Sequence, residues 1–175
     1  MKVIILAGGY GTRLGEYTDK IPKPMVLLDS KPILWHIMKS YSKYGYNEFV
    51  IALGYKQEKI KEFFLNYIYN HSDLEVDLKK NSITVVNKKT ENWKISLVDT
   101  GINTLTGGRI KRLEKIIGNE TFMLTYGDGV SDVNLKQLLA FHKKNKKLMT
   151  MTTVRPSARF GEVIVKKNLV NSFKE

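Results

Sequence analysis

The first apolar stretch of the chain, residues 3–7, contains no polar position and is rich in β-branched side chains. A short run of this kind is typical of a strand that is covered on both faces within a parallel sheet. The same kind of pattern predicts further strands over residues 49–53, 95–98, 121–125 and 148–154.

Segments with helical periodicity alternate with these strands. The pattern predicts helices over residues 32–44, 56–69, 109–117 and 134–146. Asp29 or Ser30 is the expected N-cap of the first helix, with Pro32 in its first turn and Gly45 at its end. The expected buried stripe of the second helix consists of Ile60, Phe63, Phe64, Tyr67 and Ile68.

Strands that alternate with helices of this length predict an α/β fold. We expect a three-layer arrangement around a mostly parallel sheet, with right-handed crossovers and one domain over residues 1–175. Residues 71–94 depart from the pattern, because short alternating pieces there are separated by Asn and Lys. This stretch predicts a peripheral hairpin or insertion, and subunit contacts are one interpretation of it. A terminal hairpin is expected over residues 161–173.

Composition narrows the classes of function. The chain has no cysteine, which excludes a disulfide framework and a thiolate metal site. No apolar run approaches the roughly 18 residues of a membrane span, and the first residues lack the pattern of a signal peptide. We therefore expect a cytoplasmic protein with no membrane partner.

A formal net charge of +12 makes nucleic acid a rival partner, because such a charge attracts polyanions over about 8 to 10 Å. The lysines, however, are scattered along the chain as doublets, which is typical of solvated faces. No recognised nucleic-acid motif accompanies them. We expect no nucleic-acid partner, and the excess of positive charge has no functional account.

Residues 4–25 join the first strand to three glycines, at positions 8, 9 and 11, and to the cations Arg13 and Lys23. Glycines at these positions permit positive φ and let backbone N–H groups converge on phosphate oxygens. The dinucleotide fingerprint requires glycine where Leu14 stands, and the P-loop requires Gly-Lys-Ser/Thr, which does not occur. A plain surface turn would need neither the cations nor the stiff Pro22-Lys23-Pro24. The segment therefore predicts a nucleoside triphosphate site.

The letters LAGGYGTRL followed by PKPM resemble the signature of the sugar nucleotidyltransferases, which join a sugar 1-phosphate to a nucleoside triphosphate and release pyrophosphate. Later segments resemble the branch of that family that uses CTP and glucose 1-phosphate. These are KPILWHIMKSYSKYGYNEFVIALGYK, VDTG, TGGRIKR, TYGDGVSDVNL and RFGEVIV. The likeness covers essentially the whole chain. The first motif indicates only the family, whereas the later segments favour the cytidylyl branch.

The resemblance implies a Rossmann-like nucleotidyltransferase fold of the GT-A kind, and it implies roles for particular residues. The backbone that would hold the nucleotide consists of Leu6, Ala7, Gly8, Gly9, Tyr10 and Gly11. Thr12 and Arg13 would bind the β- and γ-phosphates, and Lys23 would lie near the reacting phosphoryl groups. The loop of Thr104, with Arg109 beside it, would help to recognise cytosine. Arg13 and Lys23 are the candidate catalytic residues.

Asp128 is the candidate metal ligand, because it follows a predicted strand and is flanked by Gly127 and Gly129. Mg²⁺ favours carboxylate, water and phosphate oxygens, and two flanking glycines leave room for them. An ordinary Asp-Gly turn is the alternative, and we expect Asp132 nearby to cap the next helix or turn. Gly127 belongs with Asp128 to the expected substrate site, and Mg²⁺ is the expected cofactor.

In the family the chain continues with a Glu-Lys-Pro segment, a strand for the sugar and a second metal-binding aspartate. This sequence ends at Glu175, so the C-terminal part of the family fold, with half of the sugar pocket, is expected to be absent. The leading hypothesis is a Mg²⁺-dependent cytidylyltransferase making CDP-glucose, a step that in the family feeds O-antigen synthesis, and the resemblance implies a homo-oligomer. The alternatives are a catalytically incomplete nucleotide-binding or assembly domain, use of another nucleoside triphosphate, and a basic nucleic-acid binder.

Overall fold

The computed structural model describes residues 1–11, 21–154, 162–166 and 169–174. The chain divides into two compact units, Met1–Lys136 and Gln137–Glu175, and each is described by itself. The expectation of a single domain over the whole chain stays a prediction.

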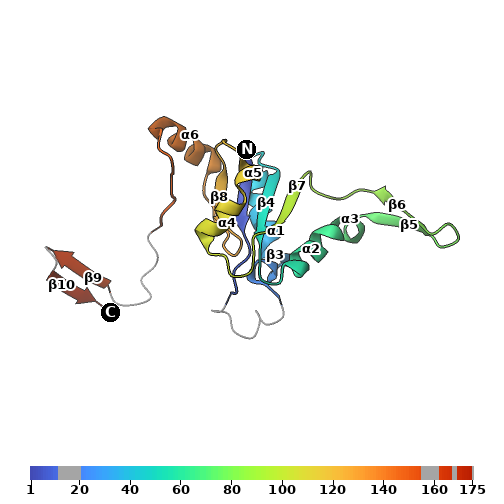
Figure 1. Cartoon of the computed structure of the whole chain (residues 1–175), viewed down its shortest axis with the longest axis horizontal. Helices are drawn as coiled ribbons and strands as arrows, with labels where there is room; N and C mark the ends of the chain where they lie inside the picture. Colours follow the sequence, from blue (N-terminus) through green and yellow to red (C-terminus); the bar gives the residue numbers. More distant parts are fainter. Residues whose placement is uncertain (12–20, 155–161, 167–168, 175) are drawn as a thin grey trace. The chain divides into compact units, whose positions relative to one another are not determined.

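The first unit is built around a four-stranded parallel sheet with the strand order β7-β4-β1-β8 (Figure 1). Its register places Val3 of β1 between Phe49 of β4 and Met123 of β8. The four predicted strands of this region are thus confirmed, with bounds that shift by at most two residues. They are β1 Lys2–Leu6, β4 Glu48–Leu53, β7 Lys94–Asp99 and β8 Met123–Tyr126.

Both faces of the sheet are covered by helices, which explains why its central strands β1 and β4 are apolar at every position after the first. Val3 and Ile5 point to the face where they pack with α1 and α2, whereas Ile4 and Leu6 pack with α5 on the other. The three-layer, Rossmann-like arrangement is therefore confirmed. The helices are α1 Ile33–Ser42 and α2 Gln57–Leu65 on the first face, and α4 Thr106–Arg112 and α5 Glu114–Ile117 in the crossover to β8.

The expected N-cap of α1 is wrong. Asp29 and Ser30 have φ values of 48° and 66° and form the two-residue turn between the short antiparallel strands β2 Leu27–Leu28 and β3 Lys31–Pro32. Two positive φ values are what the tightest hairpin turns require. Pro32 stands at the N-cap instead, with no side-chain hydrogen bond to the first turn.

The second predicted helix is divided, and one residue of its expected stripe is exposed. α2 ends at Leu65, and a separate short helix, α3 Tyr67–Asn70, follows. The break lies at Asn66, whose side chain donates to the carbonyl of Glu62 at 3.0 Å and so competes with the backbone. Ile60 and Tyr67 are buried as expected, but Ile68 is 42% exposed because the break rotates it away from the core.

Residues 71–94 contain β5 Asp73–Asp77 and β6 Ser82–Asn87, which pair antiparallel. The helix predicted over residues 134–146 is present as α6 Leu135–Asn145, and within the second unit the expected terminal hairpin is formed by β9 Glu162–Lys166 and β10 Leu169–Lys174. The strand predicted over residues 148–154 is wrong. Those residues carry no strand, because no described strand pairs with them, and Leu148 and Met149 are exposed.

Ile51 on β4 should be among the residues that contribute most to stability, because it is fully buried in an interior strand. We predict that Ile51→Ala lowers the free energy of unfolding by about 3 to 4 kcal/mol, through lost burial and a residual cavity. Urea unfolding followed by tryptophan fluorescence measures this, since both tryptophans, Trp35 and Trp93, lie in the first unit. Leu27→Ala, at a side chain that is 63% exposed, is the control. Equal effects of the two substitutions would contradict this description of the core.

Candidate active site

The carboxyl ends of the four parallel strands meet at one edge of the sheet, and the strand order reverses there. From β1 the chain adds β4 and then β7 on one side, and it returns to place β8 on the other side. In open α/β sheets ligands bind at such a reversal, outside the carboxyl ends of the strands. The loops that follow β1 and β8 flank the reversal.

The glycine-rich loop begins as a continuation of β1. The backbone N–H of Ala7 donates to the carbonyl of Ala52 at 3.0 Å, so the pairing with β4 extends one residue past the strand. Gly8 is buried, whereas Gly9 and Tyr10 are exposed. Gly11 has a φ of 72°, in the left-handed region expected for a glycine there. Thr12 and Arg13 lie outside the described residues.

Arg109 of α4 holds this edge together. Its side chain is buried, with 5% of the residue exposed, and its guanidinium donates hydrogen bonds at the carboxyl ends of three different strands. From Nη1 it donates to Leu53 O at 2.9 Å, Thr100 Oγ1 at 2.7 Å and Gly101 O at 2.8 Å, and from Nη2 to Gly8 O at 2.8 Å and Ile102 O at 3.2 Å.

Two glycines make room for this guanidinium. A Cβ atom on Gly8 would lie 2.2 Å from Arg109 Nη1, and one on Gly54 would lie 2.6 Å from the same atom. Burial, followed by the nearby charge of Arg112, lowers the pKa of Arg109 from its usual range. The structure thus places Arg109 beside the loop of Thr104, as expected, with its guanidinium held by backbone carbonyls. Its role in this arrangement is to position the loops.

The loop after β7 is fixed by a second arginine and by a carboxylate. Arg112 Nη1 donates to Thr104 Oγ1 at 2.7 Å and to Thr100 O at 2.6 Å, which leaves Thr104 half-buried and engaged. Asp99 accepts from Gln57 Nε2 at 2.9 Å and from the N–H of Gly101 at 2.8 Å. These two hydrogen bonds lower the pKa of the Asp99 carboxyl, the one from Gln57 contributing most.

Tyr10 connects the same three loops on their exposed side. Its hydroxyl donates to Asn103 Oδ1 at 2.5 Å, and its ring lies 5.2 Å from that of Tyr55, measured between centroids. Sequence reasoning named Tyr10 but missed Tyr55 and Asn103. Both residues follow the ends of predicted parallel strands. Because such ends share one edge of the sheet, the sequence could have indicated that Tyr55 and Asn103 lie near Tyr10.

Lys23 and Asp128 meet on the other side of the glycine loop. Lys23 begins the 3₁₀ helix η2 Lys23–Met25, and its Nζ lies 3.9 Å from Asp128 Oδ2. The two side chains are 19% and 45% exposed, so both remain accessible to a ligand. The N–H of Gly127 donates to the carbonyl of Leu6 at 2.9 Å, and a Cβ atom on Gly127 would lie 3.1 Å from Pro24 Cγ. The close packing of Pro24 on Gly127 explains how the Pro-Lys-Pro segment carries Lys23 to Asp128.

The surroundings of Asp128 suit a cation that is bound mainly through the phosphates of a substrate. Within the described ranges, no three or more His, Cys, Asp or Glu side chains gather as metal ligands. Mg²⁺ usually keeps several waters and uses one or two carboxylates together with substrate phosphates. Asp128, half-exposed at a strand end, fits that mode of binding.

Among the helices that are described, none is long and apolar enough to cross a membrane.

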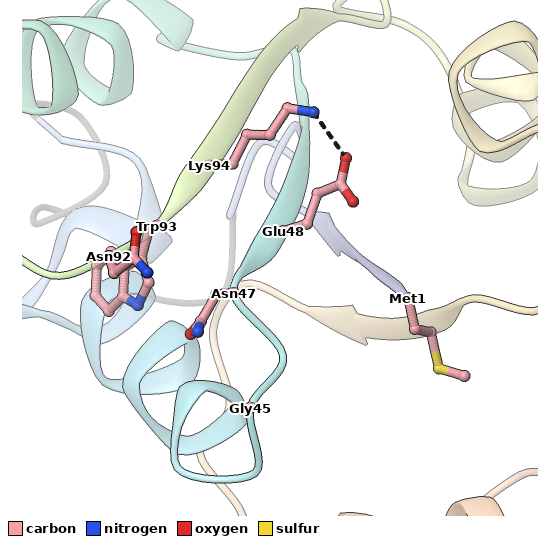
Figure 2. Close-up of a pocket in the computed structure, with 7 residues that line it drawn as sticks. All are labelled: Met1, Gly45, Asn47, Glu48, Asn92, Trp93 and Lys94. Atoms are coloured by element: carbon pink, nitrogen blue, oxygen red, sulfur yellow. Dashed lines mark ion pairs between the residues drawn. The ribbon is translucent and has the colours of Figure 1, made fainter.

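A cavity of about 340 Å³ lies at the opposite edge of the sheet, where the strands begin. Figure 2 shows Glu48 and Lys94, paired at 3.3 Å, at the starts of β4 and β7, with Trp93 and Asn92 beside them. None of the residues predicted to bind the nucleotide lines this cavity. The candidate active site is therefore the edge that carries the glycine loop.

Arg109→Lys tests the positioning role. Lysine keeps the charge but presents a point donor in place of the planar fork, so it cannot reach acceptors in three loops at once. We predict that this substitution lowers the free energy of unfolding by about 2 to 3 kcal/mol, since hydrogen bonds from charged groups contribute most. Urea unfolding measures the loss. Lys111→Met, at a neighbouring side chain that is 76% exposed, should stay within about 0.5 kcal/mol of wild type. A lysine variant as stable as wild type would contradict the role.

Comparison with known proteins gives one consistent result. The sequence matches the family described as Nucleotidyl transferase over residues 2–175. It is 45% identical over 175 residues to the probable glucose-1-phosphate cytidylyltransferase of Bacillus subtilis, and 48% identical over 176 residues to the glucose-1-phosphate cytidylyltransferase of Salmonella typhimurium. Each alignment covers all of this chain and 68% of the relative.

Solved structures resemble the fold as well. HddC from Yersinia pseudotuberculosis, complexed with GMP-PN, matches with a TM-score of 0.63 and 26% identity, over 99% of this chain and 68% of its own. A UDP-glucose pyrophosphorylase complexed with UDP-glucose matches with a TM-score of 0.59 and 23% identity, which indicates the fold alone. This chain spans about half, 54%, of that protein. The names of these proteins refer to nucleotides of three different bases, namely cytosine, guanine and uracil.

Proposed function

The chain belongs to the nucleotidyl transferase family, and from that membership we propose that it transfers the cytidylyl group of CTP to α-D-glucose 1-phosphate, with Mg²⁺ as cofactor. The products are CDP-glucose and pyrophosphate. The pairing of Lys23 with Asp128 at the reversal of strand order carries the proposal, because it sets a cation and a carboxylate beside the glycine loop. The identity of 45 to 48% over the whole chain to proteins named glucose-1-phosphate cytidylyltransferase supports the choice of CTP.

The reaction demands little covalent help from the protein. An oxygen of the sugar phosphate attacks the α-phosphorus of CTP and forms a new P–O bond. The bond from the α-phosphorus to the bridging oxygen breaks, and pyrophosphate leaves with the electron pair. The obstacle is to bring anions together, so positioning and electrostatic stabilisation supply the catalysis.

The residues of this edge would divide that work. The N–H groups of the loop from Gly8 to Gly11 would receive the nucleotide, and Lys23 would follow the α-phosphate as a mobile point charge. Arg13, with Thr12, remains the proposed contact of the β- and γ-phosphates, where a planar fork suits bidentate binding. Asp128 would hold Mg²⁺, which when bound neutralises phosphate charge and helps pyrophosphate to leave.

Recognition of the base would fall to backbone groups and to the loop of Thr104. Arg109 would act on the base through that loop, since its guanidinium is occupied by five acceptors in the described arrangement. A relative at 33% identity is named as a D-glycero-alpha-D-manno-heptose 1-phosphate guanylyltransferase, so the base differs among similar proteins.

Nucleotide binding is the most direct test. We predict that CTP with Mg²⁺ at about a hundred times its Kd stabilises the chain by about 2.7 kcal/mol and raises Tm by about 5 to 10 °C. A thermal-shift panel of CTP, UTP, dTTP, GTP, ATP and a short RNA checks this. A larger shift with another triphosphate would agree with the proposed class of reaction but would change the proposed base. A shift with RNA alone would favour a basic nucleic-acid binder, and no shift with any triphosphate would refute the proposal.

Asp128→Asn tests the metal site. The amide is nearly isosteric, and the exposed contact with Lys23 contributes little, so Tm without ligand should stay within about 2 °C of wild type. We predict that CTP still binds in the absence of metal but that added Mg²⁺ no longer tightens binding. Isothermal titration with and without Mg²⁺ measures this. Asp132→Asn, a nearby exposed carboxylate, is the matched control and should respond to Mg²⁺ as wild type does. An undiminished Mg²⁺ effect in Asp128→Asn would rule that residue out as the ligand.

A further inference from the structure

The side chain of Tyr10 links the ends of three parallel strands across the exposed side of the candidate active site. Tyr10 lies in the glycine loop after β1, and its hydroxyl donates to Oδ1 of Asn103, after β7, at 2.5 Å. Its ring packs against that of Tyr55, after β4, with 5.2 Å between the centroids and 41° between the ring planes. Because β7, β4 and β1 are neighbours in that order, the side chain of Tyr10 crosses the end of β4.

The chain on either side of Asn103 is fixed by other bonds. Arg109 Nη2 donates to the carbonyl of Ile102 at 3.2 Å, and Arg112 Nη1 donates to Thr104 Oγ1 at 2.7 Å. The residues before and after Asn103 are therefore tied to α4. With its neighbours tied and its Oδ1 atom engaged, the side-chain amide of Asn103 is held in one orientation.

The bond between Tyr10 and Asn103 orients a side chain rather than stabilising a core. Tyr10 is 46% exposed, and Asn103 is exposed as well. A hydrogen bond between exposed neutral groups contributes little to stability, because water competes for both partners. Its effect is to turn Oδ1 of Asn103 toward Tyr10, so that the two N–H groups of the amide are what Asn103 offers to a ligand. The functional edge thus presents a fixed hydrogen-bond donor.

In the proposed function the base of the nucleotide would reach this donor. Lys23 and Asp128, the proposed contacts of the α-phosphate and of the metal, meet on the side of the glycine loop where β8 ends. With the phosphates on that side, the base lies on the opposite side of the loop, over the ends of β4 and β7. Asn103 stands at the end of β7, directly before Thr104.

Resting on the proposed function, we propose that the Asn103 amide reads position N3 of the base and so selects cytosine over uracil, with Tyr10 as the positioning residue. N3 of cytosine has a lone pair and accepts a hydrogen bond, whereas N3 of uracil carries a hydrogen and donates one. The amide nitrogen of Asn103 donates to N3 of cytosine. Against uracil, two N–H groups face each other, and both lose their hydrogen bonds to water.

The hydroxyl of Tyr10 is what makes this choice strict. An amide that can turn over would present its oxygen to uracil and accept from the N3–H group. The bond from Tyr10 opposes that turn, because Oδ1 would have to leave the hydroxyl. Tyr10 therefore acts on the base through Asn103, and its ring is kept in place by Tyr55.

Isothermal titration with CTP and with UTP, in the presence of Mg²⁺, tests the proposal through the ratio of the two Kd values. We expect wild type to bind CTP at least about tenfold more tightly than UTP. Tyr10→Phe removes the hydroxyl and keeps the ring, so this preference should fall by about threefold or more while the affinity for inorganic tripolyphosphate stays unchanged. Asn103→Asp replaces donors by acceptors, so UTP should become the preferred nucleotide. The ratio cancels the general effect of the added negative charge, since CTP and UTP carry the same phosphates.

Two further variants complete the test. Asn92→Asp is the matched control, because it makes the same change at an exposed asparagine beside the opposite edge of the sheet, and it should keep the wild-type ratio. Asn103→Ala removes the donors without adding charge and should bring the ratio close to one. Circular dichroism on each variant checks folding, and Asn103→Ala decides the matter if the aspartate variant does not fold.

The outcomes distinguish this inference from the proposed function. A wild-type ratio in the folded Asn103 variants, or an equal change in Asn92→Asp, would overturn the reading of N3 by Asn103. A wild-type ratio in Tyr10→Phe would overturn the positioning role of Tyr10. Wild type that binds CTP and UTP equally would overturn both roles and leave the proposed class of reaction standing. Wild type that binds no triphosphate would refute the proposed function itself, and this inference with it.

Discussion

One buried guanidinium holds the functional edge of this fold in place. Arg109 donates to carbonyls of Gly8, Leu53 and Gly101, which lie at the carboxyl ends of three neighbouring strands. Loops at the carboxyl ends of parallel strands otherwise have few partners for their backbone groups, and buried carbonyls without partners are costly. Because Gly8 and Gly54 lack side chains, the arginine can approach the backbone closely enough to satisfy them. The glycines thus serve the scaffold as well as the proposed nucleotide site.

The proposed chemistry lies on the other side of that loop. The packing of Pro24 on Gly127 brings Lys23 to Asp128 across the reversal between β1 and β8. One half of the edge is therefore tied together by the hydrogen bonds of Arg109, while the other half presents an accessible cation and carboxylate. This division suits a reaction whose main demand is to hold anions in line, because rigid backbone donors cost no reorganisation when charge develops. In the proposed function Arg109 belongs to the scaffold and Lys23 to the chemistry.

The sequence allowed the layers of the fold to be predicted, because β1 and β4 are unbroken apolar runs and their helices have clear periodicity. Predictions from the sequence were wrong where a turn or a contact between distant residues determines the local structure. Asp29 and Ser30 have the chemistry of an N-cap but occupy a two-residue turn with positive φ. Residues 148–154 have strand-like composition, yet composition supplies no neighbour to pair with. The bond between Arg109 and Gly8 joins residues 101 positions apart, and no local pattern distinguishes a buried arginine from one that faces a ligand.

A crystal structure of the chain with CTP and Mg²⁺ tests the central claim most directly. The account predicts the triphosphate over the loop from Gly8 to Gly11, the metal on the Asp128 carboxylate, and Lys23 Nζ within about 3 Å of an α-phosphate oxygen. It also predicts that Arg109 keeps its bonds to Gly8 and Leu53 when the nucleotide binds. A nucleotide bound at the opposite edge, beside Trp93, would contradict the account. So would an Arg109 guanidinium that leaves the loop carbonyls to contact the base.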